Sequence, residues 1–205
     1  MQILLATTNE GKVRELRKLL EDFRVEIISL KDVSIKFDVK EDRSTFLENA
    51  LKKAKEYALY YSIPVVADDS GLVVDALGSM PGVYSARFYE IEFGGKVEDQ
   101  AKTTDQKNIQ KVLKLMEGEK NRSAKFVSCV VFYSPEGWGL FAEGECMGEI
   151  TEYPQGNKGF GYDPIFKPEG YDRTMAQLDI DEKNRISHRG RAFSKLSEKL
   201  SKIIT

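Results

Sequence analysis

Two adjacent carboxylates interrupt an apolar run near the middle of the 205-residue sequence. Asp68 and Asp69 follow three apolar residues, 65–67, and the apolar pattern resumes at residues 72–74 after Ser70-Gly71. A carboxylate buried without a partner costs several kcal/mol, so acids inside an apolar strand are usually paired, hydrogen-bonded or bound to a cation. Side chains alternate across a strand, so the two acids cannot both face the core, and one is free to face a cleft. The run predicts an acidic site or, because Asp-Asp-Ser-Gly is good turn chemistry, a β-turn.

A second candidate site links a strand to a helix near the N-terminus. Residues 2–6 are apolar, and from Val13 onward apolar residues recur at helical spacing, with Thr7-Thr8-Asn9-Glu10-Gly11-Lys12 between. A helix that begins in this way exposes backbone amides, which favour an anion such as phosphate, and Lys12 adds a positive charge. The alternative is that Thr8 or Asn9 only caps the helix and Lys12 is solvated. The segment lacks the glycine spacing of a Walker motif.

Two more acids, Glu41 and Asp42, lie shortly before another predicted helix. Thr45 and Glu48 have the spacing of a capping box, and the apolar residues after them have a helical period. The two acids either complement the dipole of this helix or supply a metal ligand opposite Asp69.

A glycine-rich segment, 154–164, carries Phe160 and Tyr162 between glycines. Uncrowded rings can stack on a flat ligand, although either ring could instead fill the core beneath the loop. Further on, His188 is the only histidine, so neither a histidine-based zinc site nor a Ser-His-Asp triad is available. A lone histidine is more often a satisfied structural residue than a ligand or base, but Arg189, beside Ser187 at the start of a terminal helix, favours a cluster that contacts a nucleotide.

The remaining pattern indicates one compact chain. Residues 125–133 and 138–147 read as strands joined by the turn Ser134-Pro135-Glu136-Gly137, which predicts a hairpin. Thr103 and Gln106 predict a capped helix. No repeat, low-complexity tract or linker marks a second domain, so residues 1–205 are expected to form one domain.

Composition excludes several classes of function. The sequence has 31 Lys and Arg residues and 33 Asp and Glu residues. Its net charge of −2 therefore gives no overall positive field that would attract nucleic acid. No apolar run approaches the roughly 18 residues that span a bilayer, and the N-terminus enters a strand without a basic segment. We therefore expect a cytoplasmic protein in which Cys129 and Cys146 are free thiols.

Together these segments resemble the family of inosine/xanthosine triphosphate pyrophosphatases, the noncanonical purine nucleotide hydrolases. The resemblance covers nearly the whole chain and rests on five motifs in this order: residues 6–12 (ATTNEGK), 45–50 (TFLENA), 67–72 (ADDSGL), 159–164 (GFGYDP) and 186–190 (ISHRG). Each motif alone is modest, whereas all five in this order are highly specific.

The resemblance implies a fold and a reaction. The fold is α/β, with a long curved mixed β-sheet flanked by helices and an active-site cleft between two lobes. The reaction is Mg²⁺-dependent hydrolysis of ITP, dITP and XTP to the monophosphate and pyrophosphate, which cleanses the nucleotide pool. The resemblance also implies a homodimer.

Site residues follow from the same resemblance. Asp69 is the expected general base and metal ligand, Lys12 assists catalysis, and Glu41 of the Glu41-Asp42 pair is the expected second metal carboxylate. The expected nucleotide contacts are Thr7, Thr8, Asn9, Glu10, Gly11, Lys12, Ser70, Phe160, Gly161, Tyr162, Asp163, Lys183, His188 and Arg189.

Two rival functions share some of these features. A Maf-like nucleotide pyrophosphatase that acts on modified pyrimidines or methylated guanine could share the phosphate site and the acidic strand. A nucleotide sensor could use Asp69 only to hold Mg²⁺, leaving the bound nucleotide intact.

Overall fold

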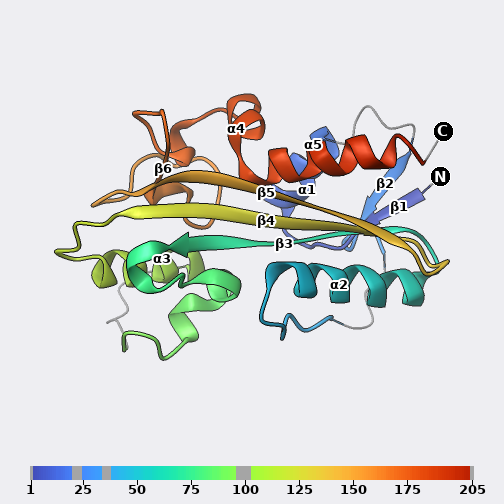
Figure 1. The fold of residues 1–205 in the computed structure, drawn as a ribbon, viewed down its shortest axis with the longest axis horizontal. Coiled ribbons are helices and arrows are strands. Elements are labelled where there is room, and N and C mark those ends of the chain that lie inside the picture. The colour runs from blue at the N-terminus through green and yellow to red at the C-terminus, as the bar shows by residue number, and fades with distance from the viewer. Residues whose placement is uncertain (1, 20–24, 34–37, 96–102, 204–205) are drawn as a thin grey trace. The chain divides into compact units, whose positions relative to one another are not determined.

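The computed structural model describes residues 2–19, 25–33, 38–95 and 103–203 (Figure 1). The chain divides into two compact units. The first unit comprises Met1–Asp69, Ser128–Gly144 and Asn184–Thr205, and the second comprises Ser70–Val127 and Glu145–Lys183. One boundary therefore falls directly after Asp69.

A six-stranded sheet with the order β2-β1-β3-β4-β5-β6 is the scaffold of the fold. Its strands are β1 (Gln2–Leu5), β2 (Glu26–Ser29), β3 (Val65–Val74), β4 (Ser123–Tyr133), β5 (Gly139–Ile150) and β6 (Phe166–Pro168). β1 pairs in parallel with β2 and β3, whereas β5 and β6 are antiparallel, so the sheet is mixed. The predicted α/β class with a mixed sheet is confirmed, while the cleft between two lobes and the single-domain organisation stay predictions.

In the first unit, alternate side chains of β1 enter two hydrophobic clusters on opposite faces of the sheet. Ile3 and Leu5 pack with α5 (His188–Leu200), and Leu4 packs with α2 (Phe46–Tyr61). Figure 1 shows these helices on opposite sides of the strands. α1 (Glu10–Leu19) follows β1 after a short loop.

The same alternation continues along the first half of β3. Val66 belongs to the cluster on the α5 side, whereas Val65 and Ala67 belong to the cluster on the α2 side. Because the period of a strand is two residues, the next side chain, Asp68, must face α5 and Asp69 must face α2. The register of the apolar residues therefore decides the surroundings of each acid.

The second unit contains short helical segments around one longer helix. These elements are η1 (Asp75–Leu77), η2 (Gly82–Glu90), α3 (Thr104–Leu115), η3 (Asp163–Ile165) and η4 (Met175–Gln177). α4 (Ile180–Ile186) begins in the second unit and ends in the first. α3 starts with the predicted capping box, in which Thr103 and Gln106 each accept a hydrogen bond from the other's backbone N–H.

The turn considered at residues 68–71 is wrong, because these residues lie inside the ten-residue strand β3. A turn would suit acids that need solvent, but both carboxylates instead find partners within the protein, so the strand continues. The predicted hairpin is confirmed by β4 and β5, which are neighbours in the sheet and joined by a turn in which the Ser134 N–H bonds Trp138 O at 2.8 Å.

The expectation of free thiols is confirmed. Cys129 and Cys146 are free and buried. Among the helices in the described ranges, none has both the length and the apolar composition needed to cross a membrane.

Candidate active site

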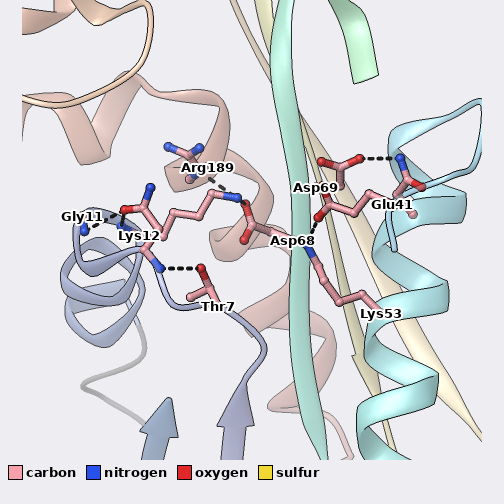
Figure 2. Close-up of polar contacts among 10 residues, drawn as sticks. Thr7, Gly11, Lys12, Glu41, Lys53, Asp68, Asp69 and Arg189 are labelled. Carbon is pink, nitrogen blue, oxygen red and sulfur yellow. Dashed lines mark hydrogen bonds and ion pairs between the residues drawn. The ribbon is translucent and has the colours of Figure 1, made fainter. Parts of the chain in front are cut away.

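Asp68 and Asp69 project from opposite faces of β3 into different electrostatic surroundings (Figure 2). Asp68 points toward Lys12 and Arg189, whereas Asp69 lies on the side of Glu41. Both are buried, with 2% and 6% of their surface exposed. Burial alone therefore does not distinguish the two acids, and their neighbours do.

Asp68 is a permanent carboxylate held between cations. Its Oδ2 lies 3.0 Å from Lys12 Nζ and 3.4 Å from Arg189 Nε. Burial by itself would raise the pKa of Asp68, but Lys12, Arg189 and Lys53 together hold that pKa well below its ordinary value. A group that stays ionised across the working pH range cannot act as a proton acceptor near neutrality, so Asp68 serves as a counterion.

Asp69 has the opposite character. Burial, with the nearby carboxylate of Glu41, raises the pKa of Asp69 to about 6, against the opposing effects of Lys53 and a hydrogen bond from Asn49. That bond joins Asn49 Nδ2 to Asp69 Oδ2 at 2.9 Å. A carboxylate with a pKa near neutrality suits a general base, since it is largely ionised at pH 7 and still accepts a proton readily.

The structure separates the two acids of the loop before α2. Lys53 Nζ forms an ion pair with Glu41, and the carboxylate of Glu41 also raises the pKa of Asp69. Asp42 is about half exposed and pairs with Lys52 at 2.8 Å. Glu41 is therefore the acid of this pair that joins the buried cluster.

Asn49 and Lys53 were missed by the sequence reasoning. They are 1% and 8% exposed, and they lie four residues apart on the same side of α2 as Ala50 and Ala54. A buried amide and a buried ammonium within an apolar helix face form the same kind of conflict as the acids of β3, and that signal could have identified them. Although burial lowers the pKa of Lys53, Glu41 and Asp68 raise it above its ordinary value.

In the loop between β1 and α1, side chains already accept hydrogen bonds from the backbone N–H groups. Asn9 Oδ1 accepts hydrogen bonds from the backbone N–H groups of Gly11 at 2.9 Å and Lys12 at 3.2 Å, and Thr7 Oγ1 accepts from Asn9 N. Asn9 thus caps α1, as one alternative expected, but Lys12 is not solvated as that alternative supposed, because it pairs with Asp68. Phosphate binding by these amides stays a prediction.

The other residues of this loop face outward. Thr8 is exposed, and Glu10 is exposed and pairs with Lys31 at 2.5 Å. Their predicted nucleotide contacts have no supporting feature in the described residues.

The start of α5 places His188 and Arg189 in the first unit, both buried. Ser187 caps the helix by accepting a hydrogen bond from Gly190 N at 3.1 Å. A Cβ atom at Gly190 would lie 1.7 Å from the carbonyl oxygen of Asn184, so only glycine allows this close approach of backbone to backbone. Gly190 therefore lets α5 begin where Arg189 reaches Asp68.

A second cluster lies in the second unit, around the ring of Phe160. Lys183 Nζ is 2.9 Å from Asp163 Oδ2 and 4.8 Å from the centroid of the Phe160 ring. Phe160 is partly exposed, while Lys183 and Asp163 are 5% and 3% exposed. The cluster combines a ring that can stack with a buried ammonium donor.

The neighbouring residues of the second unit are less suited to contact a ligand through their side chains. Tyr162 is 4% exposed and its hydroxyl donates to Ser85 O at 2.8 Å, so its ring fills the core beneath the loop, one of the two positions that the sequence allows. Ser70 is half-buried on β3, and Gly161 is half-buried in the loop.

Several of the predicted residues, joined by Lys53, gather in two groups. The carboxylate–cation cluster of the first unit contains Lys12, Glu41, Lys53, Asp68, Asp69 and Arg189, and the ring cluster of the second unit contains Phe160, Asp163 and Lys183. Across the described ranges, no set of three or more His, Cys, Asp or Glu side chains is arranged to hold a metal ion. Glu41 and Asp69 remain as a pair of carboxylates.

Comparisons with known proteins point to the same family over nearly the whole chain. Residues 3–199 match the model of the Ham1 family. A dITP/XTP pyrophosphatase of Aquifex aeolicus (strain VF5) is 53% identical over 196 residues, which cover 96% of this chain and 95% of that protein. A dITP/XTP pyrophosphatase of Hydrogenobaculum sp. (strain Y04AAS1) is 45% identical over 213 residues, covering 100% of both.

Solved structures agree as well. A HAM1 protein from Coxiella burnetii has a TM-score of 0.84 and 40% identity, with 98% of this chain and 99% of that chain covered. The Staphylococcus aureus Ham1 protein has a TM-score of 0.83 and 37% identity, with 98% of each chain covered. The family resemblance inferred from the motifs is confirmed, and the chain belongs to the Ham1 family.

Proposed function

We propose that this chain hydrolyses the noncanonical purine nucleoside triphosphates dITP, ITP and XTP to the monophosphate and pyrophosphate. The observation that carries the proposal is the contrast between two adjacent acids, one neutralised by cations and one with a pKa of about 6. The names of the curated relatives, dITP/XTP pyrophosphatase, support the choice of substrate.

Asp69 acts as the general base in the proposed reaction. A water oxygen attacks the α-phosphorus while Asp69 accepts the proton of that water. The bond between the α-phosphorus and the oxygen that bridges to the β-phosphate breaks, and pyrophosphate leaves with the bonding electrons. Asn49, bound to Asp69 Oδ2, keeps the carboxylate oriented toward the water.

The cations of the first unit stabilise the negative charge of the triphosphate. Lys12 and Lys53 carry this role, and each faces a carboxylate in this structure, at Asp68 and Glu41 respectively. Buried cations that are fixed by neighbouring side chains need little rearrangement when charge develops on the phosphate, which is the general advantage of a preorganised site.

Mg²⁺ is the cofactor we propose, held by Asp69 and Glu41. Mg²⁺ prefers oxygen ligands and is commonly bound by one or two carboxylates together with substrate phosphates, which fits this pair. The carboxylate of Glu41 raises the pKa of Asp69, and a divalent cation would relieve that repulsion. When bound, Mg²⁺ would supply positive charge against the polyphosphate.

Base recognition is proposed for Phe160, with Lys183, His188 and Arg189 as donors. Hypoxanthine and xanthine carry a keto oxygen at C6 where adenine carries an amino group, so a donor aimed at this oxygen would be left unpaired by adenine. The ammonium of Lys183, buried beside the Phe160 ring, supports this assignment.

The experiment that tests the function is pyrophosphate release from ITP, dITP, XTP, ATP, GTP, CTP and UTP, measured with Mg²⁺ under identical conditions. We expect selective cleavage of the first three. Equal cleavage of all seven would remove the base assignment and keep the phosphate assignment, whereas intact ITP after long incubation would support the sensor. Repeating the assay with EDTA tests the metal, because activity that survives chelation contradicts Mg²⁺ dependence.

We also propose that the protein is a cytoplasmic homodimer that binds neither nucleic acid nor membranes. The support is the family resemblance together with the nearly balanced charge. Light scattering after size-exclusion chromatography measures the mass directly, and a mass near 23.2 kDa would contradict the dimer.

A further inference from the structure

The loop that carries Phe160 is held at each of its residues from Phe160 to Asp163. Asp163 Oδ2 accepts a hydrogen bond from Phe160 N at 2.9 Å, and Tyr162 donates its hydroxyl to Ser85 O. Gly159 has a φ of +77°, a conformation that favours glycine, and a Cβ atom there would lie 2.0 Å from the Asp163 carboxylate. The ring of Phe160 is thus presented on a fixed backbone.

The contact at Gly161 comes from a different part of the chain. Gly161 N donates to Asp105 Oδ2 at 2.8 Å, and Asp105 lies in the first turn of α3. A hydrogen bond from a backbone N–H to an ionised carboxylate is stronger than one between neutral groups.

Asp105 is one of three polar residues spaced along one side of α3, each of which binds backbone outside the helix. Asn108 accepts from Tyr89 N and donates to Ser85 O and Ala86 O, and Lys111 donates to Phe88 O at 3.0 Å. Asn108 and Lys111 are 2% and 1% exposed, so these bonds are protected from water.

Two routes therefore connect α3 to the loop. Asp105 binds Gly161 directly, while Asn108 binds the same Ser85 carbonyl that accepts the Tyr162 hydroxyl. The first connection uses the exposed side chain of Asp105, whereas the second uses the buried side chain of Asn108. Removal of Asp105 thus leaves the interior route intact and alters the part of the loop next to Phe160.

A simpler role for Asp105 would be to stabilise its own helix. Acids in a first turn favour the helix dipole by about 0.3–1 kcal/mol. However, Thr103 and Gln106 already form a complete capping box at this end, and the Asp105 carboxylate reaches a loop 56 residues away. Helix stabilisation alone does not account for that contact.

We propose that Asp105 is a positioning residue, which fixes the backbone at Gly161 so that the Phe160 ring is presented to the purine base. The inference rests on the proposed function of Phe160 and extends it, since no contact of Asp105 with the nucleotide is required. Without the Asp105 carboxylate, Gly161, whose φ is +60° and whose surroundings are open, gains conformational freedom.

The test compares Asp105→Ala with Asp105→Asn, which keeps an acceptor oxygen, and with Thr104→Ala, an exposed neighbour in the same helical turn. We expect Asp105→Ala to raise KM for ITP about tenfold and to leave kcat within about twofold of the wild-type value, with Asn between and Thr104→Ala unchanged. The Kd of IMP, measured by calorimetry, should rise in parallel, while inhibition by inorganic pyrophosphate should not change.

The possible failures are distinguishable. If the wild-type protein neither cleaves ITP nor binds IMP, the proposed function falls and this inference falls with it. If the wild-type protein cleaves ITP and Asp105→Ala keeps the wild-type KM and IMP Kd, only the positioning role is overturned. A lower melting temperature with unchanged KM would likewise assign Asp105 to helix stability alone.

Discussion

The carboxylate–cation cluster and the ring cluster are built in different ways. In the first, side chains fix side chains: Asp68 is held by Lys12 and Arg189, and Asp69 by Asn49. In the second, most of the bonds that hold the loop end on backbone atoms, as at Phe160 N and Gly161 N.

The difference follows from what each region must supply. Proton transfer needs a group whose pKa is tuned, and tuning requires charges placed nearby. Stacking on a purine needs only a ring in a fixed position, and hydrogen bonds from the N–H groups of the loop backbone can provide that. We therefore expect substitutions in the first region to change rate or stability strongly and those in the second to change mainly KM.

The largest effect is expected at Asp69. Asp69→Asn removes the proton acceptor while keeping the size of the side chain, so kcat should fall by about 10²–10⁴-fold. Steady-state pyrophosphate release measures the loss, and circular dichroism checks that the fold is kept. A variant with wild-type kcat would remove Asp69 as the base and, with it, the contrast between the two acids.

The next effect is on stability, at Asp68. Asp68→Asn leaves Lys12 and Arg189 facing a neutral amide in a buried site, and breaking a buried ion pair costs about 3–5 kcal/mol. Urea unfolding should show that loss. The matched control is Glu145→Gln, which breaks the more exposed pair with Lys125 and should cost no more than about 1 kcal/mol. Equal losses in the two variants would contradict the assignment of Asp68 as a buried counterion.

The contribution of Asp69 to stability should depend on pH. The pKa of Asp69 in the folded protein is about 6, above its ordinary value of 3.8, so the folded state holds this proton more tightly than the unfolded chain does. The contribution of Asp69 to stability is therefore favourable at low pH and is lost as pH rises through about 4 to 6, by roughly 3 kcal/mol at most.

The measurement compares wild-type protein with Asp69→Asn in urea, in the presence of EDTA so that no metal binds. We expect the variant to be the more stable protein at about pH 8 and the advantage to shrink toward about pH 4, because only the wild-type acid ionises. An advantage that grows toward acid would show that the folded state instead stabilises the Asp69 carboxylate.

The smallest effect is expected in the ring cluster. Stacking contributes about 1–3 kcal/mol per base, so Phe160→Ala should raise KM for ITP about tenfold or more with little change in kcat. Tyr162→Phe is the comparison within the same loop, since it removes only the bond to Ser85 O; it should cost about 1 kcal/mol of stability and should raise KM less than Phe160→Ala does. An unchanged KM in Phe160→Ala would place that ring with Tyr162 as a core residue.

The order and type of most elements could be predicted from the sequence. The hairpin of β4 and β5 and the capped starts of α2 and α3 rest on short-range patterns of turn, cap and apolar residues. The strand at Asp68 and Asp69 was ambiguous, because the same four residues suit a turn when no partners are known. Asn49 and Lys53 were overlooked because helix periodicity does not reveal what a buried polar side chain meets.

The sequence by itself identified the two adjacent acids as unusual and showed which residue types could do chemistry, because these properties are local, but it left a strand and a turn open at Asp68 and Asp69. Only the tertiary structure decided which of the two acids is paired with cations. Lys12 and Arg189 reach Asp68 from the two ends of the chain, while α2 brings Asn49 and Lys53 to the side of Asp69 and Glu41. A pKa depends on the charges and hydrogen-bond donors within a few ångströms, and folding alone brings those groups together.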